Sequence, residues 1–242
     1  MSQTTITNQE DIIDSKHLGD IIQTYWKKPE DKELWRYCND ILYRMCEEQL
    51  SHNDKDIIAG KLIIIGRTYA AAVERRKTKD EDGYSNDDFY YKEVTEKMKS
   101  IHKELDTQIT NLRKYSKPTK ANFGEMIYTH KLLTETFHES TGDNKRSLAS
   151  KYLHFHCKNM FYIYDKRAED SIKNLVKNNS SLIKSLALDG DKTYVKFAVK
   201  CLTIQEFAQK EFGKALTPRD IDNILLDLAE NWGSSQNNLF RI

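Results

Sequence analysis

The chain has 242 residues, of which 38% are hydrophobic and 31% charged, with only three Pro and nine Gly. This balance excludes a disordered or fibrous protein, and the length suffices for one large domain or two small ones. Apolar runs stay below the roughly 20 residues that span a bilayer, and the polar, acidic start MSQTTITNQEDIID is not a secretory signal. We therefore expect a cytoplasmic protein with no membrane partner.

The net charge of +1 hides an uneven distribution of charged residues. Residues 141–215 carry 14 Lys and Arg against 8 Asp and Glu, whereas 1–140 carry 22 against 25 and 216–242 carry 2 against 4. Binding to nucleic acid needs a local basic patch that displaces counterions. Lysines that only solvate helix faces give the same excess, so a nucleic-acid-binding segment and an ordinary solvated surface both agree with this distribution.

Helical periodicity dominates the chain, which has no strand-rich region and no internal repeat. Apolar residues recur at helical spacing, and Pro29 and Pro118 interrupt the pattern because the residue before a proline avoids the helical conformation. We predict helices over 18–26, 34–50, 57–77, 91–115, 123–139, 146–155, 166–188, 194–212 and 218–232. The fold class is therefore all-α, divided into a helical region at 1–120 and a region at 121–242 that carries the candidate site, or forming one continuous domain.

The segment 57–77 is the most apolar, and its length and alanine run favour a buried helix over a strand. Arg67 and Glu74 are two helical turns apart within it. They could line a pocket on one shared face, or they could form a buried ion pair, because buried charges are normally paired.

The last helix has a clear start signal. Thr217, Pro218 and Asp220 supply an N-cap, a proline at the first helical position and an acidic residue three positions after the cap. Arg219 and Asp222 lie in the same turn and could face a site.

Metal binding is not expected from the cysteines or histidines. The four cysteines are widely spaced and form no CxxC pair: Cys38, Cys46, Cys157 and Cys201. Buried reduced thiols are the better interpretation. His154 and His156 would point about 200° apart on a helix, so we predict no metal and no cofactor.

The stretch 141–167, TGDNKRSLASKYLHFHCKNMFYIYDKR, is the most informative part of the chain. A polar turn with one glycine leads into a short helix, an extended run follows, and Asp165 then precedes a further helix. An Asp in that position is either an N-cap, worth about 1 kcal/mol, or a catalytic carboxylate among basic side chains.

This stretch resembles the helix-hairpin-helix DNA glycosylase superfamily, including members with the 8-oxoguanine-glycosylase-like fold. Residues 146–153, RSLASKYL, are similar to the family helix R-K-T-A-x-x-x-L, and residues 163–167, IYDKR, are similar to the element A-V-D-T-H. The resemblance implies a multi-helix glycosylase-like domain with a helix-hairpin-helix-like element, double-stranded DNA as the partner, and Asp165 as the catalytic residue.

Three departures from the family pattern narrow the implied chemistry. The hairpin glycines are replaced by residues 140–145, STGDNK, which contain a single Gly. Ser147 occupies the position of the lysine nucleophile, so we expect a monofunctional enzyme without lyase activity. The cysteine cluster that holds an iron–sulfur centre in some members is absent from this sequence.

Hydrolysis of an N-glycosidic bond creates positive charge on the sugar, which a nearby carboxylate stabilises. The target base must leave the stack, so the site needs apolar walls and a basic rim. The predicted DNA-binding residues are Lys145, Arg146, Ser147, Lys151, Lys166 and Arg167. The predicted base pocket comprises Tyr152, Phe155, Tyr162, Tyr164, Arg67 and Glu74; core packing is the ordinary role of such aromatics.

Two further readings stay open. One is a non-enzymatic helical module that binds nucleic acid or protein, with Asp165 as a cap and the basic segment as a docking face. The other is a nuclease that uses His154 or His156. The divergent hairpin suggests an unusual, chemically modified base, and by analogy a role against phage DNA that carries modified bases.

Overall fold

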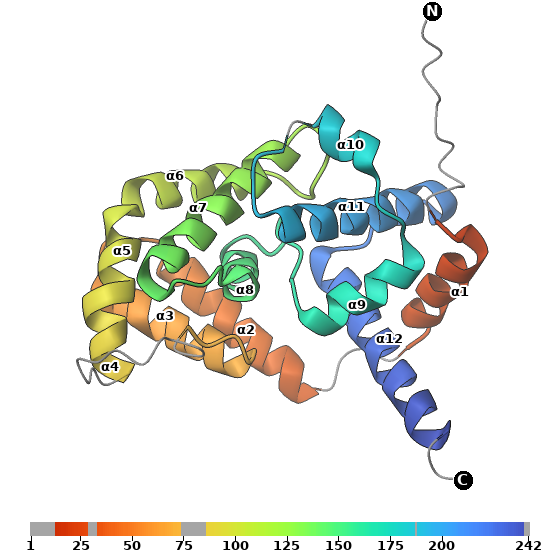
Figure 1. Ribbon diagram of the computed structural model, residues 1–242, viewed down its shortest axis with the longest axis horizontal. Helices are drawn as coiled ribbons and strands as arrows, with labels where there is room; N and C mark the ends of the chain where they lie inside the picture. The colour runs from red at the N-terminus through yellow and green to blue at the C-terminus, as the bar shows by residue number, and fades with distance from the viewer. Residues whose placement is uncertain (1–12, 29–32, 74–85, 187, 240–242) are drawn as a thin grey trace, which may run out of the picture.

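The computed structural model describes residues 13–28, 33–73, 86–186 and 188–239, and the predicted all-α class is confirmed (Figure 1). Within these ranges the only β pairing is an isolated bridge between Ile13 and Val176. The helices are α1 (Ser15–Trp26), α2 (Glu33–Glu48), α3 (Lys55–Thr68), α4 (Asn86–Phe89), the π-helical turn η2 (Tyr90–Val94), α5 (Thr95–Ser100), α6 (His102–Leu112), α7 (Phe123–Thr141), α8 (Arg146–His156), α9 (Lys166–Leu175), α10 (Ser180–Ser185), α11 (Lys192–Phe212) and α12 (Pro218–Leu239).

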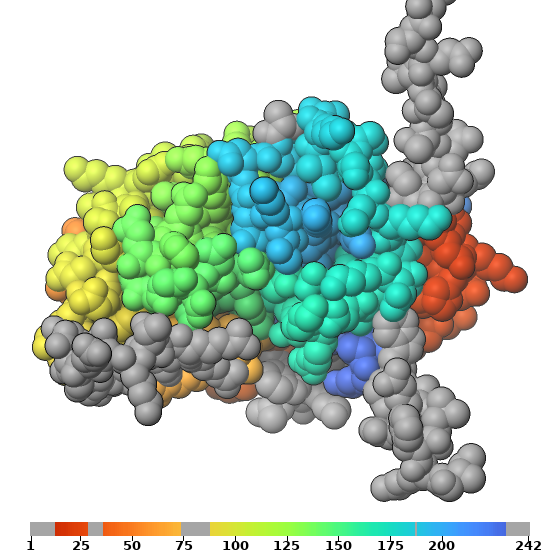
Figure 2. All heavy atoms as spheres, viewed as in Figure 1, coloured from red at the N-terminus to blue at the C-terminus, as the bar shows by residue number. Residues whose placement is uncertain are grey.

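Helix α8 lies at the centre of the molecule (Figure 1). It packs against α2, α3 and α7, and every residue from Leu148 to His156 is buried. Helix α9, which follows α8 in sequence, packs mainly on α12 and also contacts α11. Figure 2 shows α7, α11 and α9 sharing one face of the surface. The two ends of the extended run between α8 and α9 are therefore held by different groups of helices.

One hydrophobic cluster extends from Ile13 to Leu225 and includes residues on both sides of the predicted boundary at 120/121. The division into two regions stays a prediction. Among the described residues, no helix combines the length and the apolar character that crossing a bilayer requires.

Several helices begin with a side-chain cap, as expected for Asp and Asn. Asp54 accepts hydrogen bonds from two backbone N–H groups in the first turn of α3, and Asp191 accepts one from Tyr194 in α11. The predicted start of the last helix is confirmed, because the Thr217 hydroxyl accepts from the Asp220 backbone N–H at 3.1 Å while the Asp220 carboxylate accepts from the Thr217 N–H at 2.8 Å.

The predicted helix over 57–77 is wrong at its C-terminal end, since α3 stops at Thr68. The chain folds back over Gly66: a Cβ there would lie 3.0 Å from the Ala72 Cα, and the Ala71 N–H donates to the Gly66 carbonyl at 2.6 Å. Ala70 takes a left-handed conformation with φ of 53° in this turn. Tertiary packing thus overrides the helix propensity of the alanine run.

The long helix predicted over 91–115 is also divided, into η2, α5 and α6. Likewise, the stretch predicted as helical over 166–188 is interrupted between the end of α9 at Leu175 and the start of α10 at Ser180. These breaks lie away from the candidate site.

Buried histidines make the stability of the fold dependent on pH. Burial lowers the pKa of His130 to about 4, and it holds the pKa of His154 and His156 well below the usual value, because the charged ring is desolvated. An unfolded chain titrates near 6.5, so below that pH the unfolded state binds more protons. The contribution of these histidines to the unfolding free energy is therefore fully present above about pH 6.5. It falls toward pH 4 by up to about 1.4 kcal/mol per pH unit for each histidine.

The measurement is guanidinium unfolding between pH 7 and pH 4.5. Asp222 acts in the opposite direction, because burial raises its pKa to about 6, and it offsets one histidine at most. The variant His130→Gln should show a flatter pH dependence than the wild type. An unfolding free energy that stays constant from pH 7 to pH 4.5 would contradict this prediction.

Candidate active site

Asp165 caps α9, as its sequence position predicts. Its backbone is extended, with φ of −138° and ψ of 150°, and its Oδ1 accepts a hydrogen bond of 2.9 Å from the Arg167 N–H. The extended run before it is fixed to α8 by two serines. The Tyr164 N–H donates to the Ser150 hydroxyl at 2.9 Å, and the Ser147 hydroxyl donates to the Tyr164 carbonyl at 3.1 Å. Helix α8 therefore determines where the Asp165 carboxylate lies.

The second carboxylate oxygen of Asp165 faces Lys151, whose Nζ lies 3.3 Å from Oδ2. Lys151 is only 3% exposed, and its ammonium also donates to the Tyr69 carbonyl at 3.0 Å and to the Ser147 hydroxyl at 3.1 Å. The structure places this predicted DNA-contacting side chain inside the protein, in the wall of a pocket, and not on the outer surface. It is the buried partner of the candidate catalytic carboxylate.

This environment keeps Asp165 ionised. Burial raises the pKa of the Asp165 carboxyl. The Lys151 ammonium, the Arg167 N–H and the Arg167 guanidinium together lower this pKa by more than burial raises it, so the net pKa lies below the usual value. Burial lowers the pKa of Lys151, only partly opposed by the carboxylates of Asp165 and Asp222. At neutral pH the site thus holds a carboxylate that needs no proton loss before it acts.

Asp165 lines a pocket of about 470 Å³, a size typical of small-molecule sites. The lining residues are Asn39, Thr68, Tyr69, Ala70, Lys151, Ile163, Asp165, Arg167, Arg219, Asp222, Asn223, Leu226 and Glu230. They come from α2, the end of α3 and the turn after it, α8, the extended run before α9, the first turn of α9, and α12. A groove of about 650 Å³ along the α7–α8 turn shares Ala70 and Asp165 with this pocket.

The suggestion that Arg219 and Asp222 face the site is confirmed, since both line the pocket. Asn39 and Tyr69 were not among the predicted site residues. Tyr69 follows the polar end of a very apolar helix, which was a usable signal, and its hydroxyl donates to the Asn39 side chain. Asn39 gives no signal of its own, because one Asn on an amphipathic helix is common on solvated faces.

Two of the predicted pocket aromatics lie in the core instead. Tyr152 is fully buried, and its ring stacks on His156 at 4.5 Å between centroids. Tyr162 is also buried and donates a hydrogen bond of 2.9 Å to Gln205. Neighbouring residues on a helix point about 100° apart, so Lys151 can face the pocket only if Tyr152 faces elsewhere.

The other predicted pocket residues lie near the site or outside it. Phe155 packs behind the pocket wall, 5.2 Å from the Tyr69 ring, and Tyr164 lines the adjoining groove. Arg67 is exposed and does not line the pocket. Glu74 lies outside the described residues, and α3, which carries Arg67, ends at Thr68.

The predicted DNA-contacting residues differ in exposure. Arg146 makes a two-pronged ion pair with Asp191, at 2.8 and 2.9 Å, and Lys145 pairs with Asp143. Arg146 and Lys145 line the groove along the turn, together with Ser147. Lys166 and Arg167 are also ion-paired but exposed, with side chains 68% and 62% accessible.

Burial argues against a nuclease based on His154 or His156. His154 lies between the Tyr43 hydroxyl at 2.7 Å and the Phe161 carbonyl at 2.9 Å. His156 Nδ1 lies 2.8 Å from the Tyr152 carbonyl, and its Nε2 lies 3.1 Å from the Lys61 ammonium. Both nitrogens of each ring therefore have partners within the protein. In the ranges that the structure describes, no group of three His, Cys, Asp or Glu side chains could hold a metal ion.

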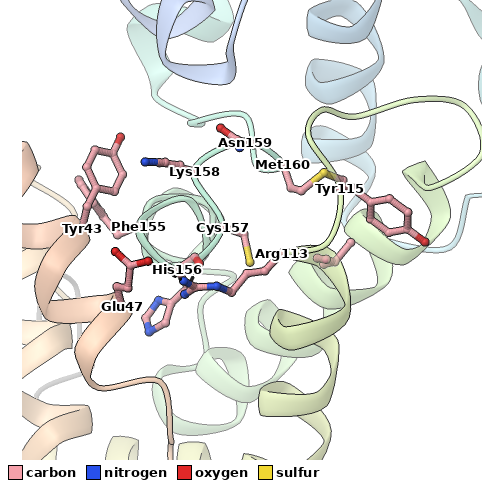
Figure 3. A pocket seen from close by; sticks show the side chains of 11 residues that line it. Tyr43, Glu47, Arg113, Tyr115, Phe155, His156, Cys157, Lys158, Asn159 and Met160 are labelled. Carbon is pink, nitrogen blue, oxygen red and sulfur yellow. Dashed lines mark hydrogen bonds and ion pairs between the residues drawn. The ribbon is translucent and has the colours of Figure 1, made fainter.

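A second, smaller pocket lies at the opposite end of α8 from Asp165 (Figure 3). Its volume of about 130 Å³ is below the usual size of a ligand site. Arg113 crosses it to pair with Glu47 at 3.2 Å, and the Lys158 ammonium lies 5.7 Å from the centre of the Tyr43 ring. These contacts use its charged groups internally, so we assign it no role.

The Lys151–Asp165 pair gives a prediction that does not depend on any activity. In Lys151→Met the pKa of Asp165 should rise, because burial would no longer be opposed by the ammonium. Carboxyl-carbon NMR titration measures this shift. Lys166→Met is the matched control, since that ammonium pairs with Glu169 and Asp170 instead. An unchanged Asp165 titration in Lys151→Met would contradict the assigned pairing.

No known protein family, curated protein or solved structure matches this chain. The interpretation of the site therefore rests on its own residues and geometry.

Proposed function

We propose that the protein is a monofunctional DNA N-glycosylase that releases a damaged or modified base from double-stranded DNA. The observation that carries the proposal is the position of the Asp165 carboxylate, which lies 3.3 Å from the buried Lys151 ammonium and lines a pocket of about 470 Å³ beside the turn that joins α7 and α8. Its place in the chain agrees with the catalytic position implied by the resemblance to helix-hairpin-helix glycosylases.

Asp165 would act on the sugar of the target nucleotide. As the N-glycosidic bond breaks, positive charge grows on the sugar ring, and a fixed negative charge in a partly buried site stabilises it. The same carboxylate can orient the water that completes hydrolysis. Oδ1 is held by the Arg167 N–H and Oδ2 by Lys151, so the group is positioned before substrate arrives.

The groove beside the pocket suits a DNA backbone. Gly142, with φ of 70°, ends α7 in a left-handed turn, and α8 begins four residues later with no side-chain cap on its first turn. Backbone N–H groups at such a helix start favour phosphate. The exposed Lys166 and Arg167 stand at the rim, where they can contact flanking phosphates.

Hydrolysis is favoured over lyase chemistry. The Lys151 amine is near the site, but its ammonium is held by Tyr69, Ser147 and Asp165. An amine attacks a sugar only after it loses its proton. Burial lowers the pKa of Lys151 and the Asp165 charge opposes this only in part, so lyase chemistry is disfavoured by the three contacts that hold the amine and not by its pKa. Water is therefore the proposed nucleophile.

The test uses end-labelled duplexes that carry single modified bases. A monofunctional glycosylase produces abasic sites, so the labelled strand should break only after treatment with hot alkali. Breakage before alkali would indicate lyase activity and contradict the monofunctional assignment. Strands that stay intact after alkali for every duplex would contradict the glycosylase itself.

A non-enzymatic DNA-binding or protein-binding module is the second candidate. It is favoured by the capping contact of Asp165 and by the Arg146–Asp191 ion pair, which would serve structure alone. This candidate predicts DNA or protein binding without base loss. A role against phage DNA bearing modified bases is part of our proposal by analogy only, and it depends on which base is released.

A further inference from the structure

Asn39, on α2, brings an amide with one unpartnered atom to the wall of the Asp165 pocket. The residue is only 9% exposed, and its Oδ1 accepts the proton of the Tyr69 hydroxyl. Its Nδ2 has no hydrogen-bond partner among the described residues, and it keeps accessible surface and is not sealed inside the protein. A largely buried polar group without a partner costs free energy, so this one requires an explanation.

The neighbours of Asn39 determine which amide atom is left for a ligand. Arg219 Nη2 lies 3.5 Å from the Tyr69 hydroxyl, and an arginine side chain can only donate. The Tyr69 oxygen therefore accepts from Arg219, and its own proton goes to Asn39 Oδ1. Burial raises the pKa of Tyr69 to about 12, so the hydroxyl keeps that proton. The opposite orientation of the amide would leave the hydroxyl proton without an acceptor, so Nδ2 is the free atom.

Tyr69 is held in place before any ligand binds. Its ring lies 5.2 Å from the Phe155 ring and 5.6 Å from the Arg219 guanidinium, and its backbone carbonyl accepts from Lys151 at 3.0 Å. The tyrosine that orients the Asn39 amide therefore also positions the lysine. Polar groups that are fixed in this way give recognition at low entropic cost.

The amide and the carboxylate meet different parts of a bound nucleotide. Tyr69 contacts Lys151 through its backbone carbonyl and Asn39 through its hydroxyl, which are opposite ends of the residue. Asp165 lies beside Lys151, with 3.3 Å between Oδ2 and Nζ. A nucleotide whose sugar lies at Asp165 can extend its base along Tyr69 toward the Asn39 amide.

A lone amide NH₂ distinguishes bases by the group that they present to it. It carries N–H donors and no acceptor. Guanine and thymine carry a carbonyl oxygen where adenine and cytosine carry an amino group. A carbonyl oxygen accepts from Nδ2, whereas an amino group would set donor against donor and leave both unpaired.

We propose that Asn39 determines base specificity, with Nδ2 donating to the exocyclic carbonyl oxygen of an extruded keto base and rejecting the amino base of similar shape. The proposal rests on the proposed function for how the base arrives in the pocket. The preference itself can be measured on free bases, without DNA.

The test is binding of free bases to the intact protein near pH 7.5, measured by saturation-transfer NMR with competition. The probes are uracil with cytosine and hypoxanthine with adenine, because each pair exchanges a carbonyl oxygen for an amino group. In at least one pair the keto base should bind about 10-fold more tightly, the effect of about one hydrogen bond. Equal binding within both pairs, tighter binding of the amino bases, or no binding of any probe would overturn the proposal.

Asn39→Asp gives a second, sharper arm. Its carboxylate can still accept from Tyr69, but an acceptor replaces the donor Nδ2, so the preference for the keto base should be lost or reversed. Asn111→Asp makes the same change of charge on α6, outside the pocket, and should keep the preference.

Two further variants keep the test decisive if Asn39→Asp does not fold. Asn39→Ala removes the amide and should abolish the preference. Tyr69→Phe removes the hydroxyl that orients the amide, so either amide atom can face the base and the preference should fall. Thermal melting establishes which variants are folded, and a wild-type preference in a folded Asn39→Ala protein would overturn the proposal.

The two proposals fail in distinguishable ways. Asp165→Asn should keep the base preference, because Asp165 acts on the sugar. A keto preference that depends on Asn39, without base release from any DNA, would overturn the glycosylase and leave the recognition site intact. Base release whose selectivity is unchanged in Asn39→Ala would overturn the recognition site alone.

Discussion

Asp165→Asn is expected to lower the rate of base release by about 1,000-fold, because the variant removes the one negative charge placed to stabilise the charged sugar. Loss of a single preorganised electrostatic contact typically costs 100- to 1,000-fold in rate. The Asn side chain has the same shape and still accepts from the Arg167 N–H. The measurement is base release under single-turnover conditions, with enzyme in excess over a duplex that the wild type processes.

The fold of this variant should survive, because Asn and Asp cap helices about equally well. Its unfolding free energy should still fall by about 1–2 kcal/mol, because the buried Lys151 ammonium loses its charged partner but keeps its hydrogen bonds to Tyr69 and Ser147. Asp54→Asn is the matched control, since Asp54 caps α3 away from the pocket and its replacement should leave base release unchanged. A folded Asp165→Asn protein that retains wild-type activity would make Asp165 a cap and nothing more.

Asp191→Ala is expected to lower the unfolding free energy by about 3 kcal/mol, the largest effect on stability that we predict. The Asp191 side chain is 6% exposed, accepts from the Tyr194 N–H at the start of α11, and binds Arg146 through both oxygens. Loss of the cap costs about 1 kcal/mol, and the unpaired Arg146 adds to this because breaking a buried ion pair strongly destabilises. Denaturant unfolding at pH 7 measures the change.

Asp189→Ala provides the control two residues away. Asp189 pairs with Lys131 but is 83% exposed, so its loss should change stability by no more than about 1 kcal/mol. A similar small effect for Asp191→Ala would mean that the ion pair does not hold the start of α8 against α11. The turn between α7 and α8, which borders the groove, would then be fixed by other contacts.

Local signals in the sequence predicted the parts of the site that depend on neighbours in the chain. The short helix at 146–155, the extended run after it and the N-terminal position of Asp165 all follow from nearby residues, and they match α8 and the start of α9. The Thr217 cap at the start of α12 was predictable for the same reason.

Features that depend on packing between distant segments were not predictable. The end of α3 at Thr68 is set by the chain folding back over Gly66, which overrides an alanine run. Tyr152 and Tyr162 looked like pocket walls because they are aromatic and near Asp165 in sequence, but they face the core. Composition gives the number of aromatics near a site and not the direction in which each one points.

The burial of the charged Lys151 was not predictable from the sequence either. A lysine in a basic stretch is usually a surface residue, and only the assembled α3–α8–α9 packing buries it against Asp165. Likewise, the local sequence indicated that Arg219 and Asp222 could face a site but not that they line the Asp165 pocket, because α12 is separated from α8 by more than 60 residues.

The most direct test of the account is mass spectrometry of free bases after the wild-type protein is incubated with double-stranded DNA carrying a panel of damaged and modified bases. We predict that one class of base is released, in an amount equal to the abasic sites formed. A folded protein that binds these duplexes yet releases no base from any of them would contradict the assignment of Asp165 as a catalytic carboxylate.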